Sequence, residues 1–219
     1  MSNLTLVIGN KKYSSWSLRP WLLLKMAGIE FKEERIFIRK EDSYTNILKY
    51  SPAGRVPCLM DGKLTIWDSL SIAEYLAETF PEKNLWPAAK NERAHARSIC
   101  AEMHSSFQNM RTQMNMNCTG YFPGKGHTPE VLDDIERILN IWTDCRVTYG
   151  KKGPFLFGPF TIADAFYAPV VFRFNTYAVK AGPDCRKYME TMLSLKPMKE
   201  WLADAKKETE VIEAYEPYR

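Results

Sequence analysis

The first eighty residues alternate between short apolar runs and amphipathic stretches, each ended by a glycine or a proline. The short runs are rich in β-branched and apolar residues, which is typical of strands. The Asp61-Gly62 pair between two of these runs indicates a tight hairpin. The predicted strands cover residues 4–8, 31–38, 57–60 and 64–67, and the predicted helices cover residues 18–27, 43–49 and 68–79.

End signals support these helices. Ser17 is a suitable N-cap for the helix over residues 18–27, and Pro20 is tolerated there because it falls in the first turn. Gly28 suits the position just past its end. Asp68 opens the third helix, and Pro81 stops it. The predicted order of elements is β-α-β-α-β-β-α.

Residues 81–89 contain two prolines among polar residues, and we interpret them as a linker. Beyond them the pattern is helical throughout. A long helix is predicted over residues 90–117, and Thr128-Pro129, Thr161, Pro183 and Pro197 mark the starts of four more. The pattern therefore predicts an α/β domain over residues 1–80, a linker over 81–89 and an all-helical domain over 90–219.

Composition excludes several classes of function. The formal net charge of +4 comes from scattered lysines and arginines, so nucleic acid is not an expected partner. No run of about 18 apolar residues is present, so we expect no membrane span. The N-terminus has no signal-peptide pattern, and the five cysteines form no CxxC pair. A cytoplasmic protein with reduced thiols and no bound metal is the expectation.

Hydroxyl groups gather just before the first predicted helix, in Tyr13-Ser14-Ser15-Trp16-Ser17. A helix N-terminus carries free N–H groups and favours negative charge. Such a site lowers the pKa of a bound thiol, and a serine hydroxyl that donates to the sulfur stabilises the thiolate further. The alternative is that these residues only cap the helix.

Two further segments are candidates for binding. A cis bond at Val56-Pro57 would leave the backbone of Val56 open to an extended peptide ligand, although an ordinary edge-strand proline explains the pair equally well. At Asp68-Ser69 a carboxylate and a hydroxyl stand at a helix N-terminus, where they either grip the charged end of a ligand or simply cap the helix.

Taken together, these three segments resemble the cytosolic glutathione transferase family. The most specific pieces are Arg55-Val56-Pro57-Cys58-Leu59, Asp68-Ser69 with Tyr75-Leu76, and Phe160-Thr161-Ile162-Ala163-Asp164. The segment from Ser14 to Arg19 is most similar to the zeta class. The resemblance implies a thioredoxin-like N-terminal domain, an all-helical C-terminal domain, glutathione as co-substrate and a homodimer.

The resemblance also implies residue roles. Ser14 would activate the thiol of glutathione, with Ser15 as its neighbour. Val56, beside Pro57, would pair with the cysteinyl backbone of glutathione. Asp68 and Ser69 would hold the γ-glutamyl end. Arg55 would lie near the glycyl carboxylate.

The second-substrate pocket is expected between the domains. On the predicted helix over residues 90–117, His104 and Arg111 share a face. They contact an anionic substrate, make interdomain hydrogen bonds or form a solvated surface. Thr176 stands where the zeta pattern has an arginine for a dicarboxylate, with Arg173 three residues earlier. This departure, together with Trp16 in place of a cysteine, makes maleylacetoacetate isomerisation less expected than conjugation of electrophiles, the detoxification chemistry of the family.

Two functions remain open. One is an enzyme that activates glutathione for conjugation or isomerisation, and the other is a non-catalytic module that binds glutathione or hydrophobic ligands on the same fold. The set formed by Ser14, Val56-Pro57 and Asp68-Ser69 is intact, which favours the enzyme.

Overall fold

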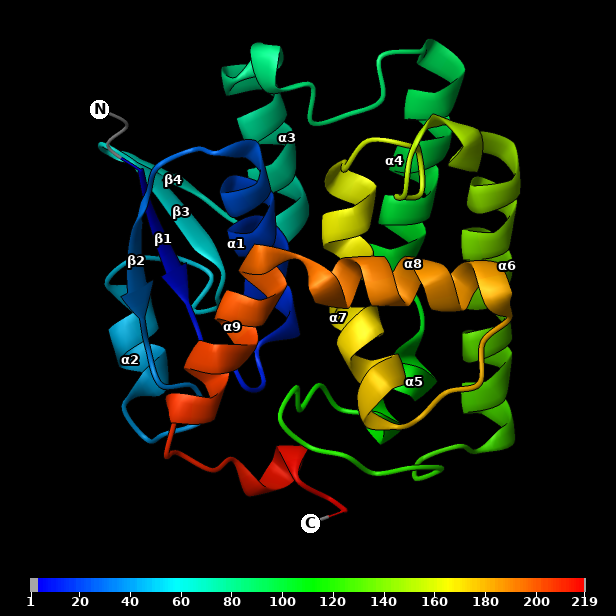
Figure 1. The fold of residues 1–219 in the computed structure, drawn as a ribbon. Coiled ribbons are helices and arrows are strands. Elements are labelled where there is room, and N and C mark those ends of the chain that lie inside the picture. The colour runs from blue at the N-terminus through cyan, green and yellow to red at the C-terminus, as the bar shows by residue number, and fades with distance from the viewer. Residues whose placement is uncertain (1–3, 219) are drawn as a thin grey trace.

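The structure of the protein, a computed structural model, describes residues 4–218. Its N-terminal part contains a four-stranded sheet with the strand order β2-β1-β3-β4 (Figure 1). β1 and β2 are parallel, whereas β1 pairs with β3 and β3 with β4 in antiparallel fashion. This confirms the predicted thioredoxin-like arrangement. The strands are β1 (Leu4–Ile8), β2 (Lys32–Arg35), β3 (Cys58–Asp61) and β4 (Leu64–Ile66).

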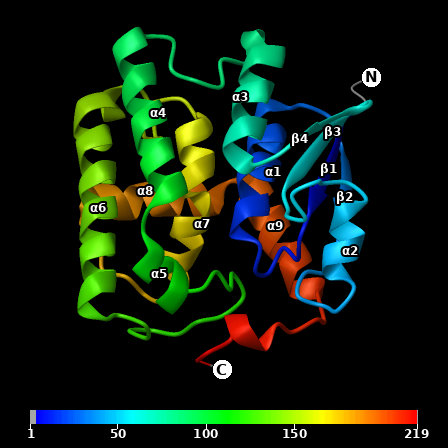
Figure 2. The ribbon, with the colours of Figure 1, turned by 180° about the vertical axis from the view of Figure 1, so that it is seen from behind.

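Helices cover both faces of this sheet (Figures 1 and 2). Successive side chains of a strand point to opposite faces, and β1 illustrates the consequence. Leu6 and Ile8 join the main core, which includes α1 and α3, whereas Val7 packs in a small cluster with Ile47 of α2. The helices of this part are α1 (Ser15–Ala27), α2 (Ser43–Leu48) and α3 (Ser69–Thr79).

The C-terminal part is helical, as predicted. α7 is its central helix, buried along nearly its whole length, and it packs against both α1 and α4. The cores of the two parts are therefore continuous. The helices are α4 (Lys90–Ser105), α5 (Gln108–Gln113), α6 (Pro129–Tyr149), α7 (Ile162–Thr176), α8 (Pro183–Ser194) and α9 (Lys196–Lys207), with short 3-10 turns at Pro81–Lys83, Gly150–Lys152 and Glu213–Tyr215.

The first helix begins three residues earlier than predicted. α1 starts at Ser15 with Ser14 in the N-cap position, so Ser17 lies inside the helix and does not cap it. Ser17 is buried in the first turn, and its hydroxyl accepts a hydrogen bond from the backbone N–H of Gly9 at 3.1 Å. Pro20 consequently lies in the second turn rather than the first. The bond from Gly9 to Ser17 ties the end of β1 to the beginning of α1.

The prediction of one helix over residues 90–117 was wrong. The chain leaves the helix between α4 and α5, where Phe107 adopts a left-handed conformation with φ 65°. A bulky residue rarely adopts this conformation. The side chain of Phe107 is only 5% exposed, and its ring packs in the core at the point where the helix is interrupted. His104 and Arg111 therefore do not share one helical face.

Unlike the signal at Ser17, three other predicted helix-start signals are confirmed. Asp68 caps α3, Thr128 caps α6, and Thr161 with Asp164 forms the capping box of α7. Gly62, in the hairpin between β3 and β4, has φ 57°, which glycine adopts without steric penalty.

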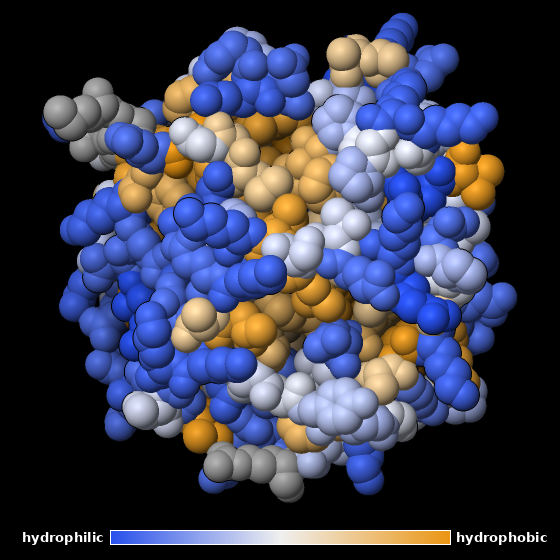
Figure 3. Space-filling model, in the orientation of Figure 1, coloured by the Kyte–Doolittle hydropathy of each residue, from blue (hydrophilic) through white to orange (hydrophobic). Residues whose placement is uncertain are grey.

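On the face shown in Figure 3, hydrophilic side chains cover most of the surface, and apolar side chains are visible near the middle. No helix within residues 4–218 is both long and apolar enough to cross a membrane. All five cysteines are buried and unpaired, and the described residues contain no cluster of side chains suited to a metal ion.

Candidate functional site

A cavity of about 620 Å³ opens beside the N-terminus of α1, at the border between the two parts of the molecule. Its walls come from the β1–α1 turn, the loop after β2, α2, the loop before β3, the region of α5, and α7. The residues that line it are Tyr13, Ser14, Ser15, Trp16, Ile38, Arg39, Lys40, Ser43, Tyr44, Ile47, Gly54, Arg55, Val56, Arg111, Asn115, Met116, Arg173 and Tyr215.

Three serines form the polar end of α1 beside this cavity. Ser14 donates a hydrogen bond to the hydroxyl oxygen of Ser17 at 2.7 Å, and Ser17 also accepts the N–H of Gly9. Ser15 accepts a hydrogen bond from a guanidinium nitrogen, Nη2 of Arg173, at 3.3 Å. Ser15 only accepts in these bonds, so its O–H proton is available to a ligand atom in the cavity. Ser14 has one O–H proton, which it gives to Ser17, so it can donate to a ligand only when that bond reverses.

The loop before β3 forms the facing wall. The peptide bond between Val56 and Pro57 is cis. Val56 and Arg55 line the cavity, and Pro57 is buried behind them. An open backbone edge of this kind is suited to pair with an extended peptide.

Asp68 and Ser69 stand at the N-terminus of α3, outside the described lining of the cavity. The carboxylate of Asp68 accepts the N–H of Leu70 at 2.9 Å, and its other oxygen lies 3.2 Å from Nε2 of His104. Ser69 is buried and accepts a weak hydrogen bond from Arg19 at 3.4 Å. His104 thus has an interdomain partner, which was one of the interpretations of this residue.

A cluster of arginines surrounds the ring of Trp16. The guanidinium carbon of Arg19 lies 4.3 Å from the ring centre and that of Arg111 lies 4.9 Å from it. Burial lowers the pKa of Arg19 well below its ordinary value, and the charges of Arg111 and Arg173 lower it further. Burial also lowers the pKa of Arg111. The side chains thus concentrate positive charge at this end of the cavity.

The positively charged side chain of Arg173 contacts Ser15. Its Nε donates to the carbonyl oxygen of Met114 at 2.9 Å, and its Nη2 donates to Ser15. Its Nη1 is buried and has no hydrogen-bond partner among the described residues. Burial, and then the charge of Arg111, lowers the pKa of Arg173 to about 9. A buried donor without a partner favours an anionic or carbonyl acceptor from a ligand.

Tyr13 lines the cavity too, but its hydroxyl is engaged elsewhere. It donates to the carboxylate of Glu216 at 2.5 Å, and its ring lies 5.8 Å from that of Tyr215. Burial, followed by the bond to Glu216, raises the pKa of Tyr13. Tyr13 is therefore less available than the serines as a donor to a sulfur atom.

The structure brings together six of the ten residues proposed from the sequence in the lining of one cavity: Ser14, Ser15, Arg55, Val56, Arg111 and Arg173. The other four, Pro57, Asp68, Ser69 and His104, lie outside this lining. Arg39, Lys40 and Tyr215 also line the cavity and were not among the residues predicted from the sequence. Arg39 and Lys40 directly follow the strand predicted over residues 31–38, which was a usable signal, whereas Tyr215 is far from every other lining residue in sequence.

Family models match both parts of the chain. The model described as "Glutathione S-transferase, N-terminal domain" matches residues 13–79, and the model described as "Glutathione S-transferase, C-terminal domain" matches residues 125–191. The chain belongs to the cytosolic glutathione S-transferase family.

Individual proteins agree with this assignment. Glutathione S-transferase 1 from Dianthus caryophyllus is 38% identical over 167 residues, which cover 72% of each chain. A probable maleylacetoacetate isomerase from Caenorhabditis elegans is 27% identical over 192 residues, or 84% of this chain and 85% of that protein. The crystal structure of a glutathione transferase homologue from Burkholderia with bound glutathione has the same fold, with a TM-score of 0.72 at 21% identity, covering 94% of this chain and all of that one.

Proposed function

We propose that the protein binds glutathione in the cavity beside α1 and activates its thiol for attack on an electrophilic small molecule. The observation that carries this proposal is the meeting of Ser14 and Ser15, at the N-terminus of α1, with the open backbone edge at Val56 in one cavity. The known function of the family and the bound glutathione of the Burkholderia homologue support it.

Glutathione would lie along the N-terminal part. Its cysteinyl backbone would pair with Val56, next to Pro57, and its γ-glutamyl end would reach Asp68 and Ser69. Arg55 would face the glycyl carboxylate. This pose places the sulfur at the N-terminal end of α1, where the helix dipole stabilises negative charge.

Two chains of hydrogen bonds then favour the thiolate. The first runs from the Gly9 N–H through Ser17 to Ser14. Without ligand Ser14 donates to Ser17, but once a thiolate is present the bond can reverse, so that Ser17 donates to Ser14 and Ser14 to the sulfur. The second runs from Arg173 through Ser15. A free cysteine thiol has a pKa of about 8.5, and donors aimed at the sulfur lower the pKa of the bound thiol toward neutrality.

The electrophile would occupy the end of the cavity near Trp16. Arg111 and Arg173 supply positive charge there, and Nη1 of Arg173 needs an acceptor. We therefore propose an electrophile that carries a carboxylate or another anionic group. This charge also keeps glutathione-dependent isomerisation of an acidic substrate as a second candidate, in line with the name of the Caenorhabditis elegans relative. His104 would act by holding Asp68 rather than by touching the electrophile.

We also propose a homodimer in the cytoplasm. Most soluble homo-oligomers are two-fold dimers. Leu64 on β4 and the adjoining Trp67 expose 51% and 45% of their surfaces, and apolar side chains that are this exposed are suited to a subunit contact.

Isothermal titration with glutathione tests the binding mode. Asp68→Asn removes the charge but retains an N-cap, because asparagine caps helices as well as aspartate does. Loss of a charged hydrogen bond, worth about 1.5–3 kcal/mol, should weaken the affinity about tenfold or more. Asp42→Asn, the same change at the N-terminus of α2, is the control and should bind like the wild type.

Unchanged affinity in a folded Asp68→Asn variant would contradict the assignment of the γ-glutamyl site. Wild-type protein that binds glutathione but turns over no electrophile would instead favour the non-catalytic binding module.

A further inference from the structure

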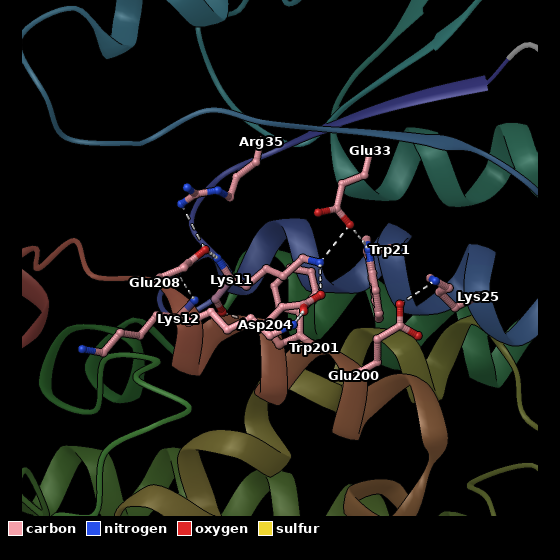
Figure 4. A network of polar contacts seen from close by, with 11 residues as sticks. Lys11, Lys12, Trp21, Lys25, Glu33, Arg35, Glu200, Trp201, Asp204 and Glu208 are labelled. Carbon is pink, nitrogen blue, oxygen red and sulfur yellow. Dashed lines mark hydrogen bonds and ion pairs between the residues drawn. The ribbon is translucent and has the colours of Figure 1, made fainter.

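A carboxylate from the far end of the chain holds the turn that precedes the candidate catalytic serines. Glu208, at the C-terminus of α9, accepts the backbone N–H of Lys11 at 2.7 Å on one oxygen and that of Lys12 at 3.0 Å on the other (Figure 4). Its side chain is only 6% exposed. A carboxylate has two acceptor oxygens, so one side chain satisfies two consecutive N–H groups.

The carbonyl groups of the same two residues are also bonded to the C-terminal part. The Lys11 carbonyl oxygen accepts the indole N–H of Trp201 at 2.8 Å, and the Lys12 carbonyl oxygen accepts the N–H of Cys118 at 3.2 Å. All four backbone polar groups of these two residues therefore bond to residues beyond the linker.

The side chain of Lys11 strengthens the same attachment. Its ammonium group lies 2.9 Å from Glu33 of β2 and 2.9 Å from Asp204 of α9. It also lies 4.9 Å from the ring centre of Trp21 and 5.5 Å from that of Trp201 (Figure 4). These contacts join α9 to α1 and β2 around the turn, and the Lys11 side chain is only 5% exposed.

The held residues are directly connected to Ser14. The N–H groups of Tyr13 and Ser14 both bond to the carbonyl oxygen of Asn10, at 3.2 and 2.8 Å. Residues 10–14 therefore form one hydrogen-bonded turn with Lys11 and Lys12 in its middle. A shift of these two residues changes where the Ser14 hydroxyl lies relative to a sulfur atom in the cavity.

We propose that Glu208 is a positioning residue for thiol activation: it fixes the β1–α1 turn from the C-terminal part, and so sets the distance from Ser14 to the sulfur of glutathione. This inference rests on the proposed function. Glu208 touches neither glutathione nor electrophile in this account and acts only through the turn. The C-terminal part thereby controls the reactivity of a thiol bound by the N-terminal part.

The experiment compares Glu208→Gln with Glu210→Gln. Glutamine keeps the shape of Glu208 but offers one acceptor oxygen, so its amide group faces the second N–H with a donor. Glu210 bonds to Arg35 at 3.1 Å, as Glu208 does at 3.3 Å, but among residues 4–218 it makes no hydrogen bond to the turn. It is therefore a matched control for the loss of a charge near Arg35.

The primary readout is the pH dependence of thiolate absorbance with glutathione bound. Glu208→Gln should raise the thiol pKa by about half a unit to one unit, which is a three- to tenfold smaller thiolate fraction below that pKa. Affinity should change less than threefold, because the peptide contacts lie elsewhere. In a Ser14→Ala background, Glu208→Gln should add almost no further shift, since coupled residues are not additive.

Hydrogen exchange of the peptide over residues 9–16 is the second readout, and it needs no ligand. It should speed up in Glu208→Gln and stay as in the wild type in Glu210→Gln. If Glu208→Gln does not fold, Trp201→Phe should give the same two changes, because it removes the N–H donor to the Lys11 carbonyl and leaves a smaller ring beside the Lys11 ammonium.

An unshifted thiol pKa in a folded variant, a full shift retained in the Ser14→Ala background, or unchanged exchange would each overturn the positioning role. Failure of the wild-type protein to bind glutathione has a separate meaning, because it refutes the proposed function while the exchange measurement still reports on the turn.

Discussion

At the scale of single residues, the cavity combines hydroxyl donors with buried positive charge. Ser15 links the two, because it accepts from Arg173 and faces the cavity that Ser14 also lines. A charged donor strengthens the hydrogen bond that it makes, so Arg173 polarises Ser15 toward donation. The same side chain retains a free buried donor, Nη1, for a second ligand group.

Arg173 should therefore make the protein prefer a negatively charged electrophile to a neutral one. Two electrophiles of similar size allow this preference to be measured. Iodoacetate and iodoacetamide differ in charge but hardly in size. Relative to the uncatalysed reaction with glutathione, the protein should favour iodoacetate. Arg173→Met should reduce that preference about tenfold or more, for the loss of one charged contact of about 1.5–3 kcal/mol.

Arg186→Met supplies the comparison for this change, because Arg186 is an exposed arginine of α8 away from the cavity. It should keep the wild-type ratio. An Arg173→Met variant that keeps the wild-type ratio as well would refute an anionic electrophile at this position.

At the scale of elements, the capping box at the start of α7 anchors the central helix. Asp164 is fully buried, and its carboxylate accepts the N–H of Thr161 at 2.8 Å and that of Leu156 at 3.0 Å. Burial raises the pKa of Asp164 to about 6, although these hydrogen bonds oppose the shift. The box thus fixes both the start of α7 and the loop that leads to it.

Asp164→Ala should lower the free energy of unfolding by about 2–5 kcal/mol, because it leaves two buried N–H groups without acceptors. Urea unfolding of the purified variant measures this loss. Asp184→Ala, at the exposed first turn of α8, should cost less than about 1 kcal/mol. Equal losses in the two variants would show that the buried bonds contribute little.

Elements whose signals are local in sequence were predictable. The Asp61-Gly62 hairpin, the cap at Asp68 and the capping box at Thr161 each follow from a few adjacent residues, and the structure has all of them. The break at Phe107 was not predictable, because no glycine or proline marks it. Phe107 adopts a left-handed conformation that a bulky residue rarely adopts, and its ring is buried in the core.

Within the site, the same distinction holds. Ser14, Ser15 and Val56 were found from short motifs. Glu208 was not, because it is one glutamate in a charged stretch, and its partners Lys11 and Lys12 are nearly two hundred residues away. Only the packing of α9 beside α1 brings them together (Figure 4).

At the scale of the whole molecule, the apolar edge formed by Leu64 and Trp67 should be covered in a dimer. Sedimentation equilibrium at micromolar concentration should show a dimer for the wild type and a shift toward monomer for Leu64→Glu, because a buried charge without a partner weakens an interface. Leu132→Glu places the same charge on α6, where Leu132 is 50% exposed, and should remain dimeric.

A wild-type mass of 25.4 kDa at all these concentrations would rule out the dimer. A dimer that Leu64→Glu and Leu132→Glu leave equally intact would place the contact on another face.

Titration of the bound thiolate by its absorbance measures whether Ser14 makes the glutathione thiol acidic. Ser14→Ala should raise the thiol pKa by about one unit, equivalent to about 1.4 kcal/mol, while the affinity for glutathione stays within threefold. Ser17→Ala should shift the pKa in the same direction by interrupting the chain from Gly9, and Tyr13→Phe should leave it unchanged, because the Tyr13 hydroxyl is bonded to Glu216. A thiol pKa that shifts only in Tyr13→Phe, or in none of these variants, would contradict this role of Ser14.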